Sequence, residues 1–144
     1  MVPTPIVVAT KMPRAPTAEQ IIQAFLRPPE LTQDNAGSGL RHYLTLIAYV
    51  NNSTYLGKQI MSKLFDDLVQ EFIEALRGAL PGASDENLYW CYHNLSGALT
   101  LTFAQTERID TLSKGKCLSS DFQAAYDHMI PFVATGFRRV CQAN

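Results

Sequence analysis

The 144-residue sequence contains little charge, and neither sign prevails. Charged residues make up 17% of the chain, with 12 Lys and Arg against 13 Asp and Glu, for a net charge of -1. A protein that binds nucleic acid by itself usually has a basic excess or stripe, which this sequence lacks. Hydrophobic residues reach 47%, too large a share for a disordered chain. We therefore expect one soluble globular domain that has no DNA affinity of its own.

Long hydrophobic runs and cysteine pairs are also missing. No apolar run approaches the roughly 20 residues of a membrane-spanning helix. The first residues have no basic stretch ahead of a short, proline-flanked apolar segment, so they do not form a secretory signal. Cys91, Cys117 and Cys141 are widely spaced and form no CxxC pair, which argues against a disulfide scaffold or a Cys-rich zinc site. We expect a cytoplasmic protein that makes no membrane contact.

The usual motifs of catalysis and cofactor binding are absent as well. The chain has no GxGxxG, no phosphate loop and no HExxH pair. His42, His93 and His128 lie in three separate predicted helices, so only the fold could assemble a metal site from them. We expect no cofactor, no metal and no enzymatic activity.

Helical periodicity is what the sequence has in abundance. No segment sustains the alternation of a strand, whereas apolar residues recur at intervals of three and four. Residues 1–16 contain four prolines and are predicted to form an extended arm, ahead of a helical domain at 17–144. We predict an all-α fold, an antiparallel bundle of five to six helices. The helices are expected at 17–26, 40–50, 55–80, 84–106 and 120–141, with a polar loop at 110–119.

Short local signals mark where these helices begin and break. Thr17 and Gln20 form a capping-box pattern, and Ser84 is placed to cap the helix that follows it. Gly57 is expected to kink or split the long helix at 55–80, and Pro131 to kink the last one.

The helix at 84–106 carries the most distinctive stretch. Between Leu88 and Ala104 it has no charged side chain apart from His93, which indicates burial on most sides. Its segment LYWCYHNLSGAL, residues 88–99, resembles the eighth helix of the TetR-family (tetracycline-repressor-like) transcriptional regulators.

The flanking elements resemble the same family in the same order. Residues 17–28 are similar to the family's fourth helix, and the long helix ending in LRGALPG, residues 76–82, to its seventh. Residues 120–141 are similar to its ninth helix, so the resemblance covers roughly residues 17–142.

The resemblance implies a sensor without its DNA-reading part. Family members read DNA through an N-terminal helix-turn-helix domain, for which the sixteen residues before Thr17 leave no room. We expect the effector-binding and dimerisation domain alone, either an excised piece or a natural truncation. In a full-length regulator, binding of a small hydrophobic effector would reposition the DNA-reading heads. DNA would be contacted only through the missing helix-turn-helix.

The effector site is predicted between the helix at 40–50, the long helix and the helix at 84–106. Helical spacing places one set of mainly apolar and aromatic residues on the inward faces of these helices. That set offers few polar groups, so the ligand is expected to be largely hydrophobic and neutral or weakly acidic, such as an aromatic or fatty metabolite. The predicted ligand-binding residues are Tyr43, Ile47, Met61, Phe65, Trp90, His93, Asn94 and Gly97.

A two-fold homodimer is predicted through the last two long helices. The helix at 120–141 has more apolar surface than the core of one small domain needs, and family members pair these helices as a four-helix bundle. The predicted interface residues are Leu101, Phe122, Tyr126, Met129, Val133, Gly136, Phe137 and Val140.

Two other functions fit the same sequence. The chain could be a small helical enzyme or ligand carrier, which titrating groups converging on the cavity would favour. It could also be a dimerising interaction module that blocks a full-length regulator. Sequence upstream of Met1 would separate a fragment from a truncated member.

Overall fold

The structure, a computed structural model, describes residues 14–26 and 38–142. Residues 14–17 are not helical, while the rest of the expected proline-rich arm and the segment after Leu26 lie outside the described residues. The described residues form helices and no strand, which confirms the all-α prediction. The elements are α2 (Ala18–Leu26), α3 (Ser38–Asn51), the π-helix η2 (Gly57–Met61), α4 (Ser62–Ala79), α5 (Asp85–Ala104), α6 (Arg108–Leu112) and α7 (Phe122–Cys141).

The helix starts follow the caps that the sequence indicates. Thr17 and Gln20 form reciprocal hydrogen bonds at the start of α2. The backbone N–H of Gln20 donates to Thr17 Oγ1 at 3.3 Å, and the backbone N–H of Thr17 donates to Gln20 Oε1 at 2.9 Å. Ser84 Oγ accepts a hydrogen bond from the backbone N–H of Asn87 at 3.2 Å and so caps α5. The capping box and the Ser84 cap are therefore confirmed.

The long helix predicted at 55–80 is divided at its start. The π-helix η2 occupies its first turns, and regular α-helix begins at Ser62. Gly57 lies against the end of α3, where a Cβ atom would come within 3.1 Å of the Val50 carbonyl oxygen and 3.2 Å of that of Asn51. This close approach explains why residue 57 is a glycine and why the predicted helix is divided at this point. The short helix α6 also lies partly within the segment predicted to be a loop.

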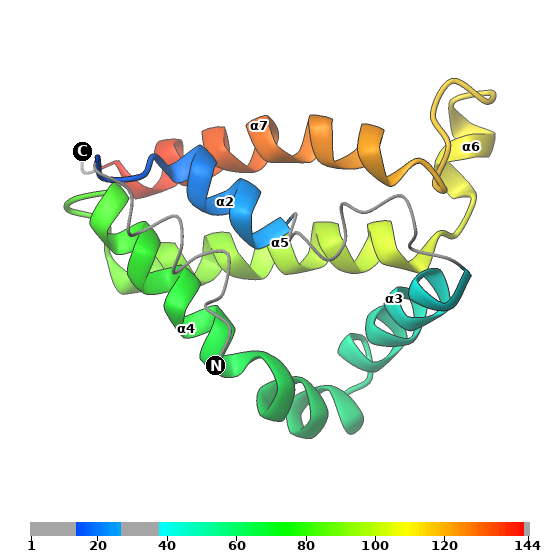
Figure 1. Cartoon of the computed structure of the whole chain (residues 1–144), viewed down its shortest axis with the longest axis horizontal. Coiled ribbons are helices and arrows are strands. Elements are labelled where there is room, and N and C mark those ends of the chain that lie inside the picture. Colours follow the sequence, from blue (N-terminus) through cyan, green and yellow to red (C-terminus); the bar gives the residue numbers. More distant parts are fainter. Residues whose placement is uncertain (1–13, 27–37, 143–144) are drawn as a thin grey trace.

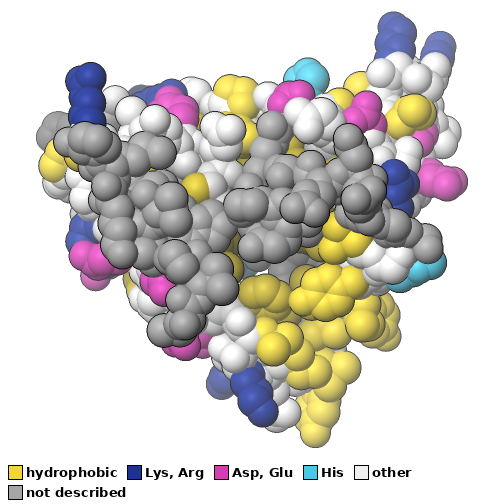
Figure 2. All heavy atoms as spheres, viewed as in Figure 1, with side chains coloured by type: hydrophobic (Ala, Val, Ile, Leu, Met, Phe, Trp, Pro, Cys, Tyr) yellow, Lys and Arg dark blue, Asp and Glu magenta, His cyan; other side chains and the backbone are white. Residues whose placement is uncertain are grey.

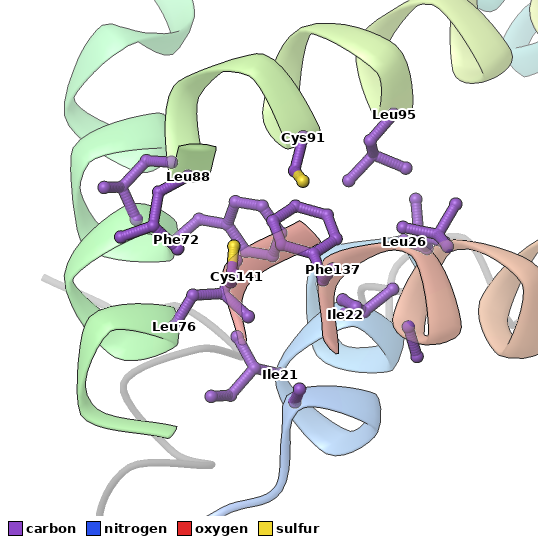
Figure 3. Packing of buried hydrophobic residues seen from close by; sticks show 14 of the residues in the cluster. Ile21, Ile22, Leu26, Phe72, Leu76, Leu88, Cys91, Leu95, Phe137 and Cys141 are labelled. Atoms are coloured by element: carbon purple, nitrogen blue, oxygen red, sulfur yellow. The ribbon is translucent and has the colours of Figure 1, made fainter. Parts of the chain in front are cut away.

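The hydrophobic core lies at one end of the molecule, where α2, α4, α5 and α7 meet (Figures 1 and 3). At its centre the Phe72 ring is fully buried and stacks on Phe25, with ring centroids 4.3 Å apart. Phe137 of α7 meets the same ring edge-on at 6.1 Å. Aliphatic side chains such as Ile22 and Leu88 complete the packing.

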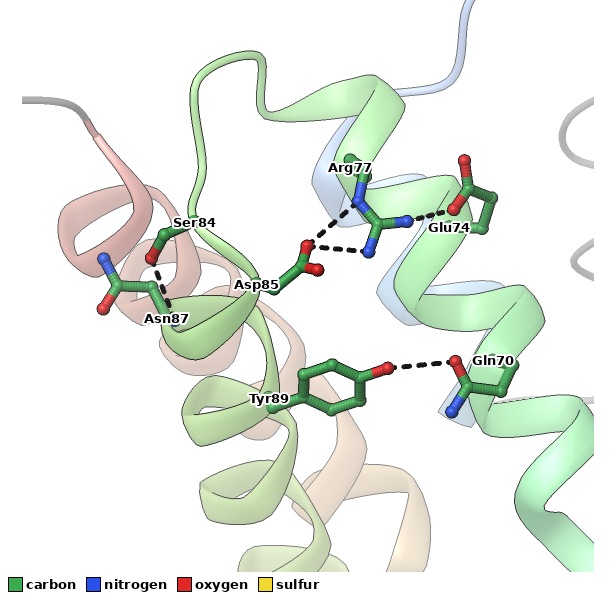
Figure 4. A network of polar contacts seen from close by, with 7 residues as sticks. All are labelled: Gln70, Glu74, Arg77, Ser84, Asp85, Asn87 and Tyr89. Carbon is green, nitrogen blue, oxygen red and sulfur yellow. Dashed lines mark hydrogen bonds and ion pairs between the residues drawn. The ribbon is translucent and has the colours of Figure 1, made fainter.

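Polar contacts hold α4 and α5 together outside this core (Figure 4). Arg77 of α4 donates to Asp85 Oδ1 through Nε at 3.2 Å and Nη2 at 2.8 Å, and also pairs with Glu74. One turn further along α5, the Tyr89 hydroxyl donates to Gln70 Oε1 at 3.0 Å. The two helices therefore have a fixed relative position along their exposed side.

The chain from residue 38 to 61, here called the α3–η2 unit, lies away from the core. In Figure 1, α3, α4 and α5 run along three sides of a triangle, with η2 at the corner between α3 and α4. Leu44, Ala48 and Val50 are the buried hydrophobic residues of α3, and none of them belongs to the main core cluster. Within this unit, α3 packs mainly against α5 and η2, and η2 packs against α4 and α3, so the unit does not enter the core.

Candidate ligand and dimerisation surfaces

The predicted ligand-binding residues of α5 lie on the side of this helix that is exposed in the protomer. The Trp90 side chain is 59% exposed, and His93, Asn94 and Gly97 are exposed beside it. The His93 ring meets the Trp90 ring edge-on, with centroids 5.6 Å apart. The prediction that these four residues face inward is wrong, because the opposite face of α5 supplies the buried core residues.

The other predicted ligand residues come from the elements that border the triangle. Ile47 of α3, Met61 of η2 and Phe65 of α4 are half-buried, and Phe65 packs against the core. Tyr43 is exposed, so the expected inward position is wrong for it as well.

A set of hydrogen-bonded polar side chains joins α3 to the inner side of α5. Asn51 Nδ2 donates to Thr100 Oγ1 at 2.7 Å and to Ser96 Oγ at 3.3 Å. A hydrogen bond also joins the side chains of Tyr92 and Ser96, and burial raises the pKa of the Tyr92 hydroxyl in spite of that bond. We call Asn51, Tyr92, Ser96 and Thr100 the inner polar group. It contains no charged side chain.

Sequence reasoning missed the inner polar group, although a signal was present. Tyr92, Ser96 and Thr100 recur at four-residue intervals and therefore share one face of α5. Because α5 has almost no charge on any side, spacing alone predicts which residues share a face but not which face is buried.

Most predicted dimer residues of α7 lie inside the protomer. Tyr126, Met129, Val133 and Phe137 are buried, the last three within the main core cluster. Because their surface is largely covered within one protomer, they have little area left for a partner, and the predicted contact itself stays a prediction. Phe122 is half-buried and meets Phe103 edge-on, with ring centroids 6.4 Å apart.

The remaining predicted interface residues are exposed and lie on a surface that α5 and α7 share. Asn87 Nδ2 near the start of α5 donates to the Val140 carbonyl near the end of α7 at 3.0 Å, while Phe103 meets Phe122 at the opposite ends. The two helices therefore run antiparallel and side by side. Helical spacing places one set of exposed residues along their common outer side, here called the outer face: Trp90, Asn94, Gly97, Leu101, Phe132, Gly136 and Val140.

The outer face is apolar and has room for close approach. Phe132 is 79% exposed, and Leu101 and Val140 are also largely exposed. At Gly97 and Gly136 an added Cβ atom would meet nothing within 4 Å in the protomer. Neither glycine is therefore required by packing within one chain.

Two other kinds of site, a metal centre and a membrane-spanning helix, are missing from residues 14–26 and 38–142. No group of three or more His, Cys, Asp or Glu side chains in these ranges could hold a metal ion. None of the helices found there combines the length and apolar character needed to cross a membrane.

These features define an all-helical domain with two candidate binding surfaces, an inner one lined in part by uncharged polar groups and an apolar outer one. The family model for the tetracyclin repressor-like C-terminal domain matches residues 23–136, and the chain belongs to this family. No helix-turn-helix domain is detected in the sequence. Neither a curated protein nor a solved structure matches the chain significantly.

Proposed function

We propose that this chain is the small-molecule-sensing and dimerisation domain of a tetracycline-repressor-like transcriptional regulator. The observation that carries the proposal is the outer face of α5 and α7, which is apolar, continuous and uncovered in the protomer. Family membership supports a regulatory role rather than a catalytic one.

The proposed dimer pairs the outer faces of two chains around a two-fold axis. Each chain would contribute α5 and α7 to a four-helix bundle, so that the same residues meet from both sides. A stable interface of this kind buries more than about 1,000 Å² in total. Gly97 and Gly136 would let the helices of the two chains approach closely, since neither position presents a Cβ atom.

Charge placed on the outer face tests the dimer. Phe132→Glu should convert the protein to monomers in sedimentation velocity experiments at tens of micromolar. Leu112→Glu is the matched control, because Leu112 is also exposed but lies on α6. A wild-type monomer at these concentrations would refute the proposed dimer.

A second pair of variants tests the close approach separately. Gly97→Ala should favour the helix by about 1 kcal/mol within the protomer yet weaken the dimer, because the new methyl group meets the partner helix. Gly78→Ala, at an open position of α4, should give the same helix gain with no change in dimer affinity. Unchanged dimer affinity in Gly97→Ala would show that the helices do not meet at this residue.

We place the effector site on the inner side of α3, α4 and α5. Ile47, Met61 and Phe65 would supply its apolar wall, and the inner polar group would orient the ligand. Since none of these side chains is charged, the ligand should be largely hydrophobic and neutral or weakly acidic. Trp90, Asn94 and Gly97 belong to the outer face in this arrangement and not to the effector site, and His93 is exposed beside Trp90.

A thermal-shift screen of aromatic and fatty compounds tests this placement. A ligand of the folded domain raises its stability by RT ln(1 + [L]/Kd), so the melting temperature should rise with ligand concentration. Ser96→Ala should weaken the response, whereas Asn94→Ala, two residues away on the opposite face, should leave it unchanged. The reverse pattern, or no shift from any compound, would contradict the site.

Regulation would require that the effector distinguish two arrangements of the dimer. A ligand shifts such an equilibrium only by its difference in affinity for the two states. DNA itself would be contacted by a helix-turn-helix domain outside this chain. We therefore expect the purified chain not to retard duplex DNA, and salt-sensitive retardation at micromolar concentration would contradict this expectation.

A further inference from the structure

The largest group of exposed hydrophobic side chains lies at neither of the surfaces already assigned. It occupies α3, the turn after it, η2 and the first turn of α4. Figure 2 shows hydrophobic side chains gathered over this corner of the molecule. The group, here called the corner surface, consists of Tyr43, Leu46, Tyr49, Tyr55, Leu56, Ile60 and Leu64, with exposed fractions from 36% to 76%.

The segment that carries the corner surface contains basic side chains and no acidic ones. The chain from residue 38 to 65 contains no Asp or Glu, although it has Arg41, Lys58 and Lys63. All three cations are exposed, and so is His42. The first carboxylates are those of Asp66 and Asp67, both exposed on α4, and Asp67 lies one turn beyond Lys63. The corner surface is thus apolar, with Lys58 and Lys63 at its edge.

Exposed apolar groups of this extent usually mark a contact with another molecule, since isolated soluble domains rarely leave large contiguous apolar patches uncovered. The proposed effector site does not account for them, because it uses the half-buried side chains of the same elements. The proposed dimer does not account for them either, because it uses α5 and α7.

We propose that the corner surface binds an amphipathic helix of another protein, one with large apolar anchors flanked by Asp or Glu. Leu56, Ile60 and Leu64 are exposed and spaced by four residues, from the turn before η2 to the first turn of α4. Leu46 and Tyr49 project from α3, which packs against η2. Side chains of a partner helix would fit between these two sets of exposed side chains. Its carboxylates would meet Lys58 and Lys63, whereas Arg41 lies over the Phe122 ring of α7, 5.9 Å from its centroid.

The charge count favours such a helix over the other anionic partners. Lipid surfaces are typically bound through clusters of four to eight Lys or Arg, each contributing about 1 kcal/mol. The two lysines at the edge of the corner surface are too few for that mode. They are also too few for firm sequence-independent binding to nucleic acid, which depends on many phosphate contacts.

Two synthetic helical peptides test the proposal by fluorescence anisotropy with the full chain. The first carries Leu at positions i, i+4 and i+7 with Glu on both flanks, and the second replaces every Glu by Lys. The acidic peptide should bind at least tenfold more tightly than the basic one, a difference of about 1.4 kcal/mol. Its affinity should fall as salt concentration rises.

Matched variants locate the contact on the molecule. Lys58→Glu with Lys63→Glu should weaken binding of the acidic peptide at least tenfold, and Ile60→Ser should also weaken it. Lys114→Glu with Lys116→Glu changes the same charge on exposed residues elsewhere and should have no effect. Circular dichroism and the sedimentation coefficient should match the wild type in every variant, which separates this result from loss of the fold or of the proposed dimer.

Several outcomes would overturn the proposal. These are equal affinity for the two peptides, no binding of the acidic peptide, or binding that persists in Lys58→Glu with Lys63→Glu. Tight association with vesicles of anionic phospholipid would identify a membrane contact instead. Higher oligomers that Ile60→Ser abolishes would identify a second copy of this chain as the occupant.

Discussion

The core end of the molecule and the α3–η2 unit are held in place by different forces. At the core end, α2, α4, α5 and α7 enclose one continuous apolar cluster around the fully buried Phe72. The α3–η2 unit buries fewer apolar side chains, namely Leu44, Ala48 and Val50 of α3, and it also joins α5 through hydrogen bonds, above all those of Asn51. Thr45 Oγ1 adds a bond to the Phe103 carbonyl at 3.3 Å.

This difference indicates where the molecule can respond to a partner. Apolar burial stabilises by about 25 cal/mol per Å² and is distributed over many contacts, so the core end should open only with global unfolding. A few hydrogen bonds contribute about 1 kcal/mol each, so the α3–η2 unit should open at a lower free energy. Both the proposed effector site and the corner surface include residues of this less stable region.

The largest expected effect comes from the centre of the core. Phe72→Ala should lower the free energy of unfolding by about 3–5 kcal/mol, because the lost burial adds to an unfilled cavity. Tyr49→Ala removes an aromatic ring of similar size from α3, where it is 73% exposed, and should change stability by no more than about 0.5 kcal/mol. Urea unfolding followed by circular dichroism measures both. Similar losses in the two variants would remove the distinction between the regions.

A smaller effect is expected where the α3–η2 unit joins α5. Asn51→Ala removes two hydrogen bonds and should lower the free energy of local opening of the α3–η2 unit by about 1–3 kcal/mol. Hydrogen exchange should become faster in residues 38–61, while amides of α7 keep their protection. Asn52→Ala is the matched control, since the neighbouring Asn52 side chain is exposed. Equal acceleration in α7 would mean that the two regions unfold together.

A glycine pair tests the close contact between η2 and α3. Gly78→Ala fills open space on α4 and should stabilise the protein by about 1 kcal/mol. Gly57→Ala should instead destabilise the protein, because its methyl group would press on two backbone carbonyls of α3. Thermal unfolding of the two variants gives the comparison. A stabilised Gly57→Ala protein would show that α3 and η2 can separate without cost.

The effect that is smallest at neutral pH concerns the two buried thiols of the core end. Burial raises the pKa of Cys91 from 9.0 to about 12 and also raises that of Cys141. The folded chain therefore keeps the Cys91 proton where the unfolded chain loses it, and stability should decline as pH rises from about 9 towards 12. At neutral pH only Cys117, which is exposed, should react promptly with a thiol reagent. Prompt labelling of all three would indicate an open core.

The sequence predicted the helices well because their signals are local. The Thr17–Gln20 capping box and the Ser84 cap depend on residues three positions apart, and their geometry is as expected. In α4, charged side chains mark the exposed side, so the buried positions of Phe72 and Leu76 follow from spacing.

Orientation of the uncharged helices could not be predicted in the same way. In α5, neither side carries enough charge to identify the exposed one, so spacing alone does not show that Trp90 lies on the exposed side. In α7, apolar residues lie on two sides: Phe137 is buried, whereas Phe132 is the most exposed large hydrophobic side chain of the described residues. The packing of α2 and α5 against α7 decides between them. A helix that contacts the core on one side and a partner on the other is apolar on both sides. Periodicity identifies the buried side only when the other side is polar.

The position of Trp90 provides an intrinsic optical probe. It is the only tryptophan in the chain, and in the protomer more than half of its surface meets water. Its fluorescence should therefore shift to shorter wavelength when two chains associate and should change little when an isolated protomer unfolds. Emission and circular dichroism recorded on the same diluted sample would then follow two separate equilibria, association by the first and folding by the second.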